Sequence, residues 1–242
     1  MLYDLAVILP VYNEEGCITD VIHSWHRMLK ENTINFKMII LNDGSKDATA
    51  KALEQFSSFP EIQIINKKNS GHGPTILTGY WQAVREAIWV FQCDSDNEMK
   101  PDSFVKLWQQ RENYDALFGI RTGRVQNWLR KIISAVSRMT VYAFCGKGVS
   151  DVNVPYRLIR SSVLEGIINQ IPEDTFAPNV IISAALTKMK ARLWECPVDY
   201  QPRQTGKSLA SIKAFKAAFK AFRQTGECLS RMKYNQGEIR GV

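Results

Sequence analysis

Closely spaced carboxylates are the strongest chemical signal in this sequence. Asp94 and Asp96 stand two positions apart, Ser95 lies between them, and Glu98 follows. Two carboxylates at this spacing can reach one hard cation where a strand leads into a loop. Mg²⁺ or Mn²⁺ prefers oxygen ligands, and Mg²⁺ keeps places open for water and phosphate. An isolated pair of this kind is more often a solvated acidic turn, so its position in the fold decides between the two interpretations.

Two further polar clusters follow earlier apolar runs. Pro10, Tyr12 and Glu14 come after the first run, and Asn42 and Asp43 come after the second. Proline and asparagine commonly end strands, and Asn-Asp-Gly-Ser is ordinary turn and helix-cap chemistry. Each cluster alone is therefore better explained by structure than by function.

Strand and helix patterns alternate through the first half of the chain. Apolar runs predict strands, and apolar residues at helical spacing predict helices. The expected strands span residues 5–11, 37–41, 62–65, 88–93 and 114–119, and the expected helices 18–29, 48–56, 75–85 and 102–111. This alternation predicts an α/β fold with a mostly parallel central sheet flanked by helices, which binds ligands beyond the carboxyl ends of its strands.

That fold gathers four carboxylates along one edge of the sheet. Glu14, Asp43, Asp94 and Asp96 each follow a predicted strand, so their side chains should lie close together. Four carboxylates repel one another unless a cation or a donor-rich ligand lies among them. The position of the acidic pair at the end of a buried strand thus favours a ligand site over a solvated turn.

The second half of the chain is less regular. Helices are expected over residues 127–144, 161–170 and 178–189, and a short strand over 191–198. No linker rich in glycine, serine or proline interrupts the sequence. We expect one domain over residues 1–203 and a basic amphipathic extension over residues 204–242.

Composition narrows the classes of protein. No apolar run approaches the ~18 residues of a membrane-spanning helix, and the first residues lack the basic region of a signal peptide. The five cysteines are widely spaced, which argues against a zinc site or a disulfide framework and favours a reducing cytosol. The net charge is +7, with a surplus of basic residues in 121–160 and 203–223. Such asymmetry indicates contact with an anionic partner.

The extension suggests what that partner is. On a helical projection, Ile212, Phe215, Phe219 and Phe222 form an apolar stripe, and an adjacent stripe is basic: Lys213, Lys216, Lys220 and Arg223. This pattern is typical of a helix that lies on an anionic membrane surface, and it predicts a cytoplasmic protein peripheral to the inner face of the membrane. A helix packed on the domain with solvated lysines explains the same pattern.

The combined motifs resemble a known family. P-V-Y-N-E, N-D-G-S-K-D-A-T, N-S-G-H-G-P-T and D-S-D-N-E are similar to the nucleotide-binding half of family 2 inverting glycosyltransferases with the GT-A fold. Within that family the chain is most similar to dolichol- or polyprenyl-phosphate sugar transferases, over about residues 5–208. The family usually has aspartate where this chain has Asn42, and glutamine or another polar residue where it has Glu98.

The resemblance implies roles for individual residues. Pro10, Tyr12, Glu14 and Asp43 would hold the nucleoside of a UDP- or GDP-linked sugar. Asp94 and Asp96 would bind the diphosphate through Mg²⁺ or Mn²⁺, with Glu98 as a third metal ligand. Arg121 would approach substrate phosphate, and Arg203 and Lys207 match a motif that closes over phosphates, a task suited to such side chains.

The expected reaction is displacement at the anomeric carbon with inversion. The metal held by Asp94 and Asp96 would neutralise charge on the leaving diphosphate. A lipid-phosphate acceptor needs no strong base, whereas a glycan hydroxyl does, and Glu173 or Asp174 would then be the catalytic base. A carbohydrate hydroxyl acceptor in surface polysaccharide assembly remains the alternative.

Two other classes fit less well. The aromatic residues of the basic segments follow helical spacing and the sheet edge is acidic, which argues against a nucleic-acid-binding module. Asn42 raises the possibility of an inactive transferase, but the intact Asp94–Asp96 pair argues against it.

Overall fold

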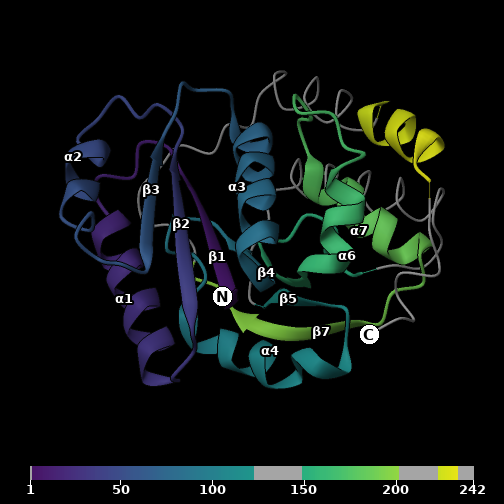
Figure 1. The fold of residues 1–242 in the computed structure, drawn as a ribbon, viewed down its shortest axis with the longest axis horizontal. Coiled ribbons are helices and arrows are strands. Elements are labelled where there is room, and N and C mark those ends of the chain that lie inside the picture. Colours follow the sequence, from purple (N-terminus) through teal and green to yellow (C-terminus); the bar gives the residue numbers. More distant parts are fainter. Residues whose placement is uncertain (1, 123–148, 202–222, 234–242) are drawn as a thin grey trace.

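A seven-stranded sheet forms the middle of the molecule, with helices on both faces (Figure 1). The computed structural model describes residues 2–122, 149–201 and 223–233. The strands are β1 (Tyr3–Val11), β2 (Phe36–Asn42), β3 (Ile62–Asn66), β4 (Ala87–Cys93), β5 (Ala116–Thr122), β6 (Tyr156–Arg160) and β7 (Leu193–Asp199). The predicted α/β class with a mostly parallel sheet is confirmed.

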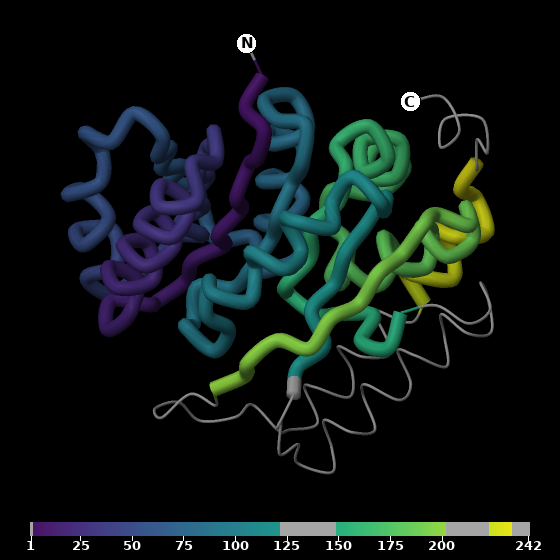
Figure 2. Tube along the Cα trace, turned by 90° about the horizontal axis from the view of Figure 1, so that it is seen from below, coloured from purple at the N-terminus to yellow at the C-terminus, as the bar shows by residue number. Residues whose placement is uncertain are grey.

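The strand order is β3-β2-β1-β4-β6-β5-β7. All neighbouring pairs are parallel except those of β6, which runs antiparallel to β4 and to β5. β7 runs along β5 at the edge of the sheet (Figure 2). The sequence interpretation had no strand at β6, because two arginines in five residues do not read as a buried strand. Arg157 is nevertheless fully buried.

The central strands form because their residues are apolar on both faces, as expected for a strand covered by helices on each side. Every residue from Leu5 to Leu9 has 0% of its surface exposed. Predicted strand positions therefore agree closely with the structure. The largest shift is at β5, which begins two residues later than predicted and ends three residues later, at Thr122.

Two layers of helices enclose the sheet. The helical elements are α1 (Ile18–Glu31), α2 (Thr49–Glu54), α3 (His72–Glu86), η1 (Pro101–Ser103), α4 (Phe104–Gln110), η2 (Arg111–Asn113), α6 (Ser161–Ile168) and α7 (Pro178–Lys188). On one face, Trp25 of α1 packs against Phe91, Phe104 and Tyr156, with ring centroids 5.1–6.1 Å apart. On the other face, α3 packs on β1 and β4, with α6 and α7 beside it (Figure 1).

The predicted helices are found with shifted ends. α3 begins three residues before the predicted start because Pro74 is tolerated in a first helical turn. The helix expected over 127–144 lies outside the described residues. None of the helices in the described part of the chain is both long and apolar enough to cross a membrane.

Only residues 223–233 of the predicted extension are described, and residues 223–231 are helical. This helix, yellow in Figure 1, packs on the domain through Thr225 and Leu229, each 1% exposed. Gln224 accepts a hydrogen bond from the backbone N–H of Phe176. The helix over residues 223–231 is thus attached to the loop between α6 and α7. The apolar stripe from Ile212 to Phe222 lies outside the described residues.

Candidate active site

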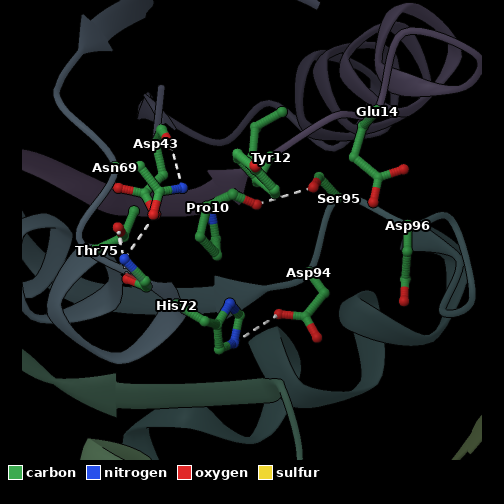
Figure 3. Close-up of a pocket in the computed structure, with 12 residues that line it drawn as sticks. Pro10, Tyr12, Glu14, Asp43, Asn69, His72, Thr75, Asp94, Ser95 and Asp96 are labelled. Carbon is green, nitrogen blue, oxygen red and sulfur yellow. Dashed lines mark hydrogen bonds and ion pairs between the residues drawn. The ribbon is translucent and has the colours of Figure 1, made fainter. Parts of the chain in front are cut away.

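A cavity of about 430 Å³ opens at the carboxyl ends of β1, β2 and β4. The residues that line it come from the end of β1, from the loops after β1, β2, β3 and β4, and from the start of α3. They are Pro10, Val11, Tyr12, Glu14, Asp43, Asn69, Gly71, His72, Thr75, Asp94, Ser95 and Asp96 (Figure 3). The four carboxylates expected at one sheet edge thus line one cavity, whose volume suits a small ligand.

Hydrogen bonds join the loops after β1 and β2 into one rigid wall. The N–H of Asp43 donates to the carbonyl of Val11 over 2.9 Å, and the N–H of Glu14 donates to the Thr49 hydroxyl over 2.8 Å. The Asn13 side chain accepts from the N–H of Lys46 over 2.8 Å. These bonds fix the backbone that presents Tyr12 and Glu14 to the cavity.

The Asp43 carboxylate is saturated by donors from the chain itself. Its Oδ1 accepts from Lys67 Nζ at 2.6 Å and from the N–H of Ser70 at 2.9 Å, and its Oδ2 accepts from the N–H of Gly71 at 2.9 Å. Burial alone would raise the pKa of Asp43, but these hydrogen bonds outweigh it and hold that pKa below its ordinary value. Asp43 is therefore a fixed anion that shapes the loop after β3.

Asn42 has a local structural role. Its Nδ2 donates to Asn66 Oδ1 at 2.9 Å, and its Oδ1 accepts from the N–H of Ser45 at 3.1 Å. The side chain thus ties β2 to β3 and closes the turn after β2. Where the family usually has aspartate, this chain has an asparagine whose NH₂ group donates to the Asn66 amide oxygen. Asn42 is not among the cavity-lining residues.

Asp94 and Asp96 are in the opposite electrostatic state. Burial raises the pKa of Asp94, although the positive charges of His72 and Arg121 oppose the shift. Burial and the negative charge of Asp94 raise the pKa of Asp96 to about 7, and Glu14 adds to the effect. Figure 3 shows Glu14, Asp94 and Asp96 on one side of Pro10 and Tyr12, and Asp43 on the other. The cavity therefore has a neutralised end and an end with excess negative charge.

Ser95 and Tyr12 shape the middle of the cavity. The Ser95 hydroxyl donates to the carbonyl of Pro10 over 2.8 Å and is buried, so it fastens the Asp94–Asp96 loop to β1. Tyr12 is 43% exposed, and its ring offers a flat apolar surface between the two ends. The arrangement can accept a ligand with a planar group and, through a cation at the acidic end, an anionic group.

The acidic end fits a divalent cation. Asp94 and Asp96 offer carboxylate oxygens, the ligands that Mg²⁺ and Mn²⁺ prefer, and their excess charge calls for a positive counterpart. The described residues contain no group of three or more His, Cys, Asp or Glu side chains placed to hold a metal. Glu98, predicted as a third ligand, donates its backbone N–H to Asp96 Oδ1 over 3.1 Å. Two carboxylates completed by substrate phosphate and water are a usual Mg²⁺ environment.

Other predicted site residues lie at or beyond the rim. Arg121 pairs with Asp151, with its Nε 3.0 Å from the Asp151 carboxylate, and does not line the cavity. Glu173 and Asp174 are exposed in the loop before α7 and do not line it either. The same loop contacts the start of α3, where a Cβ on Gly73 would clash with the carbonyl oxygens of residues 175 and 176. Arg203 and Lys207 lie outside the described residues.

Besides Val11, four cavity residues had no role in the sequence interpretation: Asn69, Gly71, His72 and Thr75. They belong to the N-S-G-H-G-P-T segment and to the start of α3. His72 Nε2 lies 3.6 Å from Asp94 Oδ1. Their position in the sequence could have predicted them, because this segment follows the third strand and so reaches the same edge of the sheet. Lys67, the partner of Asp43, gave no signal because 24 residues separate the two.

Comparison of sequences identifies relatives. The sequence model described as glycosyl transferase family 2 matches residues 6–168. An undecaprenyl-phosphate 4-deoxy-4-formamido-L-arabinose transferase of Pseudomonas fluorescens is 25% identical, covering 86% of this chain and 60% of the relative. The protein of that name from Serratia proteamaculans is 26% identical, covering 86% and 63%. The chain therefore spans about three fifths of the length of these curated relatives.

Solved structures share the fold. Glucosyl-3-phosphoglycerate synthase of Mycobacterium tuberculosis, in complex with Mn²⁺, UDP-glucose and phosphoglyceric acid, aligns with a TM-score of 0.69 at 15% identity over 94% of this chain and 80% of that one. S. aureus TarS in complex with UDP-GlcNAc aligns with a TM-score of 0.63 at 18% identity over 96% and 68%. Both likenesses concern the fold alone.

Proposed function

The chain belongs to glycosyl transferase family 2, and from that premise we propose that it transfers a sugar from a nucleoside diphosphate to a polyprenyl-phosphate-type lipid with inversion. The observation that carries this proposal is the cavity shared by Asp43, Tyr12, Asp94 and Asp96. It combines a fixed polar end, a flat aromatic surface and an acidic end. The polar end and the aromatic surface suit a nucleoside, whose base is planar, and the acidic end suits a diphosphate bound through a divalent cation.

The donor nucleotide would lie with its nucleoside against Pro10, Tyr12, Glu14 and Asp43. The N-terminal end of α3 borders the same cavity, and Gly71, His72 and Thr75, which line it, would contact the nucleotide there. The rigid hydrogen-bonded wall formed by the loops after β1 and β2 makes the site largely preformed. Preformed sites bind with a smaller loss of conformational entropy. UDP in the ligand-bound relatives of this fold supports a nucleoside diphosphate donor.

Asp94 and Asp96 would hold a Mg²⁺ or Mn²⁺ ion, with Glu98 as a further ligand. An ion bound there would neutralise the charge that develops on the leaving diphosphate. The side chains of Asp94 and Asp96 orient the diphosphate, while Tyr12 and Pro10 keep the nucleoside apart from it. The Mn²⁺ in the structure of the M. tuberculosis enzyme supports the choice of metal.

The acceptor is inferred from the two relatives, which are undecaprenyl-phosphate 4-deoxy-4-formamido-L-arabinose transferases. A lipid phosphate oxygen is already a nucleophile and needs no strong base. Arg121, Arg203 and Lys207 would then grip the acceptor or leaving phosphates. If the acceptor is instead a glycan hydroxyl, Glu173 or Asp174 must take the proton, and both are exposed in the loop that borders α3.

A lipid acceptor requires access to a membrane surface. The basic and apolar stripes of the 204–242 extension would bind anionic lipid at the cytoplasmic face. Sedimentation with vesicles rich in anionic lipid tests this interaction. Replacement of Lys213, Lys216 and Lys220 by glutamine should weaken binding by about 1 kcal/mol for each lysine near the surface. Equal sedimentation of the two proteins would contradict it.

The transfer itself is tested with a panel of UDP- and GDP-sugars and two acceptors, polyprenyl phosphate and a soluble glycan. A thermal-shift series with UDP or GDP, with and without Mn²⁺, first identifies the nucleotide, because a ligand of the folded state raises apparent stability. We then expect a glycosylated lipid phosphate by mass spectrometry, and none with Asp96→Ala. Transfer only to the glycan would establish the alternative acceptor class.

A further inference from the structure

A chain of buried polar side chains lies beneath the acidic end of the cavity. Tyr80 of α3 donates its hydroxyl to Asn179 Oδ1 over 3.1 Å, and Asn179 Nδ2 donates to Gln92 Oε1 over 3.0 Å. Gln92 Nε2 in turn faces Asp94 Oδ1 at 3.3 Å. Tyr80 and Gln92 are 0% exposed, and Asn179 is 3% exposed. These hydrogen bonds thus connect α3, through α7 and β4, to one carboxylate of the site.

The hydrogen bonds of this chain of side chains all point in one direction. The buried Tyr80 hydroxyl donates to Asn179 Oδ1. With its oxygen occupied, the Asn179 amide presents its NH₂ group to Gln92, and Gln92 presents its own NH₂ group to Asp94. Every donor is directed toward the Asp94 carboxylate. Both amide orientations are fixed by partners deep in the core.

A buried arginine supports the same elements. Arg157 lies beside Gln92 in the register of β6 and β4. Its guanidinium donates to the backbone carbonyls of Val154 at 2.8 Å and Asn179 at 3.0 Å, and it also reaches Ser183 of α7 at 3.4 Å. These contacts fix the first turn of α7, which carries Asn179. The arginine therefore holds in place the residue that orients Gln92.

Polar side chains are expensive at this depth. A buried amide costs free energy unless all its hydrogen bonds are made, and an apolar residue of similar shape is often as stable. The neighbour of Gln92 on β1 is Ile8, as expected for a strand core. Two amides that satisfy each other and end on a cavity carboxylate point to a role in orienting that carboxylate.

We propose that Gln92 and Asn179 are positioning residues that hold Asp94 in the orientation in which it binds the metal–diphosphate group. The inference rests on the proposed function. Within the described residues, Gln92 and His72 both contact Asp94 at Oδ1, and Oδ2 is directed elsewhere in the cavity. Since Asn179 is the second residue of α7, just after the 172–177 loop, the same hydrogen-bonded side chains link that loop to the donor end of the site.

The test compares the loss of one buried polar side chain with the loss of all three. Gln92→Met and Asn179→Leu each leave a buried partner unsatisfied, so each should lower both stability and Mn²⁺ affinity. The triple variant Tyr80→Phe, Gln92→Met, Asn179→Leu replaces all three polar groups with apolar ones, which should recover part of the stability. We expect Mn²⁺ affinity in the triple variant to remain about 10–100-fold below wild type, the usual effect of losing an outer-shell partner.

The readouts are direct binding of Mn²⁺ by electron paramagnetic resonance, with and without UDP or GDP, and thermal unfolding. Ser161→Ala is the matched control, because it removes a buried hydrogen bond to Ala87 at the opposite end of β4. It should lower the unfolding temperature and leave Mn²⁺ affinity unchanged. A triple variant with wild-type Mn²⁺ affinity would overturn the inference alone. Absence of Mn²⁺-dependent nucleotide binding by the wild type would overturn the proposed function and the inference with it.

Discussion

The loop after β2 and the loop after β4 both carry aspartates into one cavity, yet the two loops treat them in opposite ways. Asp43 receives Lys67 and two backbone N–H groups, and its pKa lies below the ordinary value. Among the described residues, Asp94 accepts a hydrogen bond from Gln92 and Asp96 accepts one from the N–H of Glu98, and the pKa of both carboxyls is raised. A carboxylate satisfied by its own chain builds the site, whereas one left short of donors is available to a ligand.

The largest expected effect concerns the acidic loop. Asp94→Asn or Asp96→Asn should lower sugar transfer by at least about 10³-fold, because several kcal/mol of transition-state stabilisation would be lost. The fold should persist, which circular dichroism checks. Asp102→Asn removes an exposed carboxylate nearby and serves as the control. Transfer within tenfold of wild type for both site variants would remove the distinction between the loops.

Substitution of Lys67 tests the loop after β2, in which the Asp43 carboxylate is hydrogen-bonded by the chain itself. Lys67→Met leaves the Asp43 carboxylate, 5% exposed, without its ion-pair partner, and should lower the free energy of unfolding by about 3 kcal/mol. Nucleotide affinity should fall as the 67–71 loop loosens. Lys30→Met breaks the exposed Lys30–Glu61 pair and should cost less than about 1 kcal/mol in urea unfolding. Equal losses in the two variants would show that Asp43 is not held in the way described.

The two loops should also differ in the pH dependence of stability. In the folded, metal-free protein Asp96 has a pKa of about 7, above the ordinary value of 3.8. Its ionisation therefore opposes folding, and the penalty grows as pH rises from about 4 to about 7 and is constant above that. Asp96→Asn should raise the unfolding temperature by about 2–4 °C for each kcal/mol of relieved penalty, at pH 8 but not at pH 4.

Asp43→Asn should behave in the opposite way. The lowered pKa of Asp43 means that its charge stabilises the folded state above the ordinary pKa, and that this stabilisation is lost as pH falls through the folded value. The substitution should therefore lower the unfolding temperature at pH 8. Calorimetry of both variants in chelator at pH 4 and pH 8 gives the comparison, and shifts of the same sign would contradict it.

The smallest expected effect is at Asn42. Asn42→Asp keeps the acceptor for Ser45 and needs only rotation of the Asn66 amide to restore the other bond. We expect a loss of stability of about 1 kcal/mol or less and transfer within a few-fold of wild type. Loss of transfer comparable to that of the Asp94 variant would give Asn42 a direct role in the site.

The sequence predicted the frame of the site because that frame depends on order along the chain. Buried apolar strands located the sheet edge, and the edge located Glu14, Asp43, Asp94 and Asp96. The difference between these carboxylates was not predictable, since it depends on donors such as Lys67 that are distant in sequence. β6 was missed for a similar reason: Arg157 is buried only because carbonyls of neighbouring segments receive its guanidinium.

The reversed direction of β6 determines which segment borders the cavity. Its amino end pairs with the carboxyl end of β4, so the segment before it, residues 149–155, opens on the edge where the cavity lies. Asp151 of this segment already reaches Arg121. A longer segment inserted there would approach the cavity without altering the pairing of the parallel strands. If the proposed transfer is correct, a change in this segment would alter the surroundings of the acceptor and leave the loops after β1 and β2 unchanged.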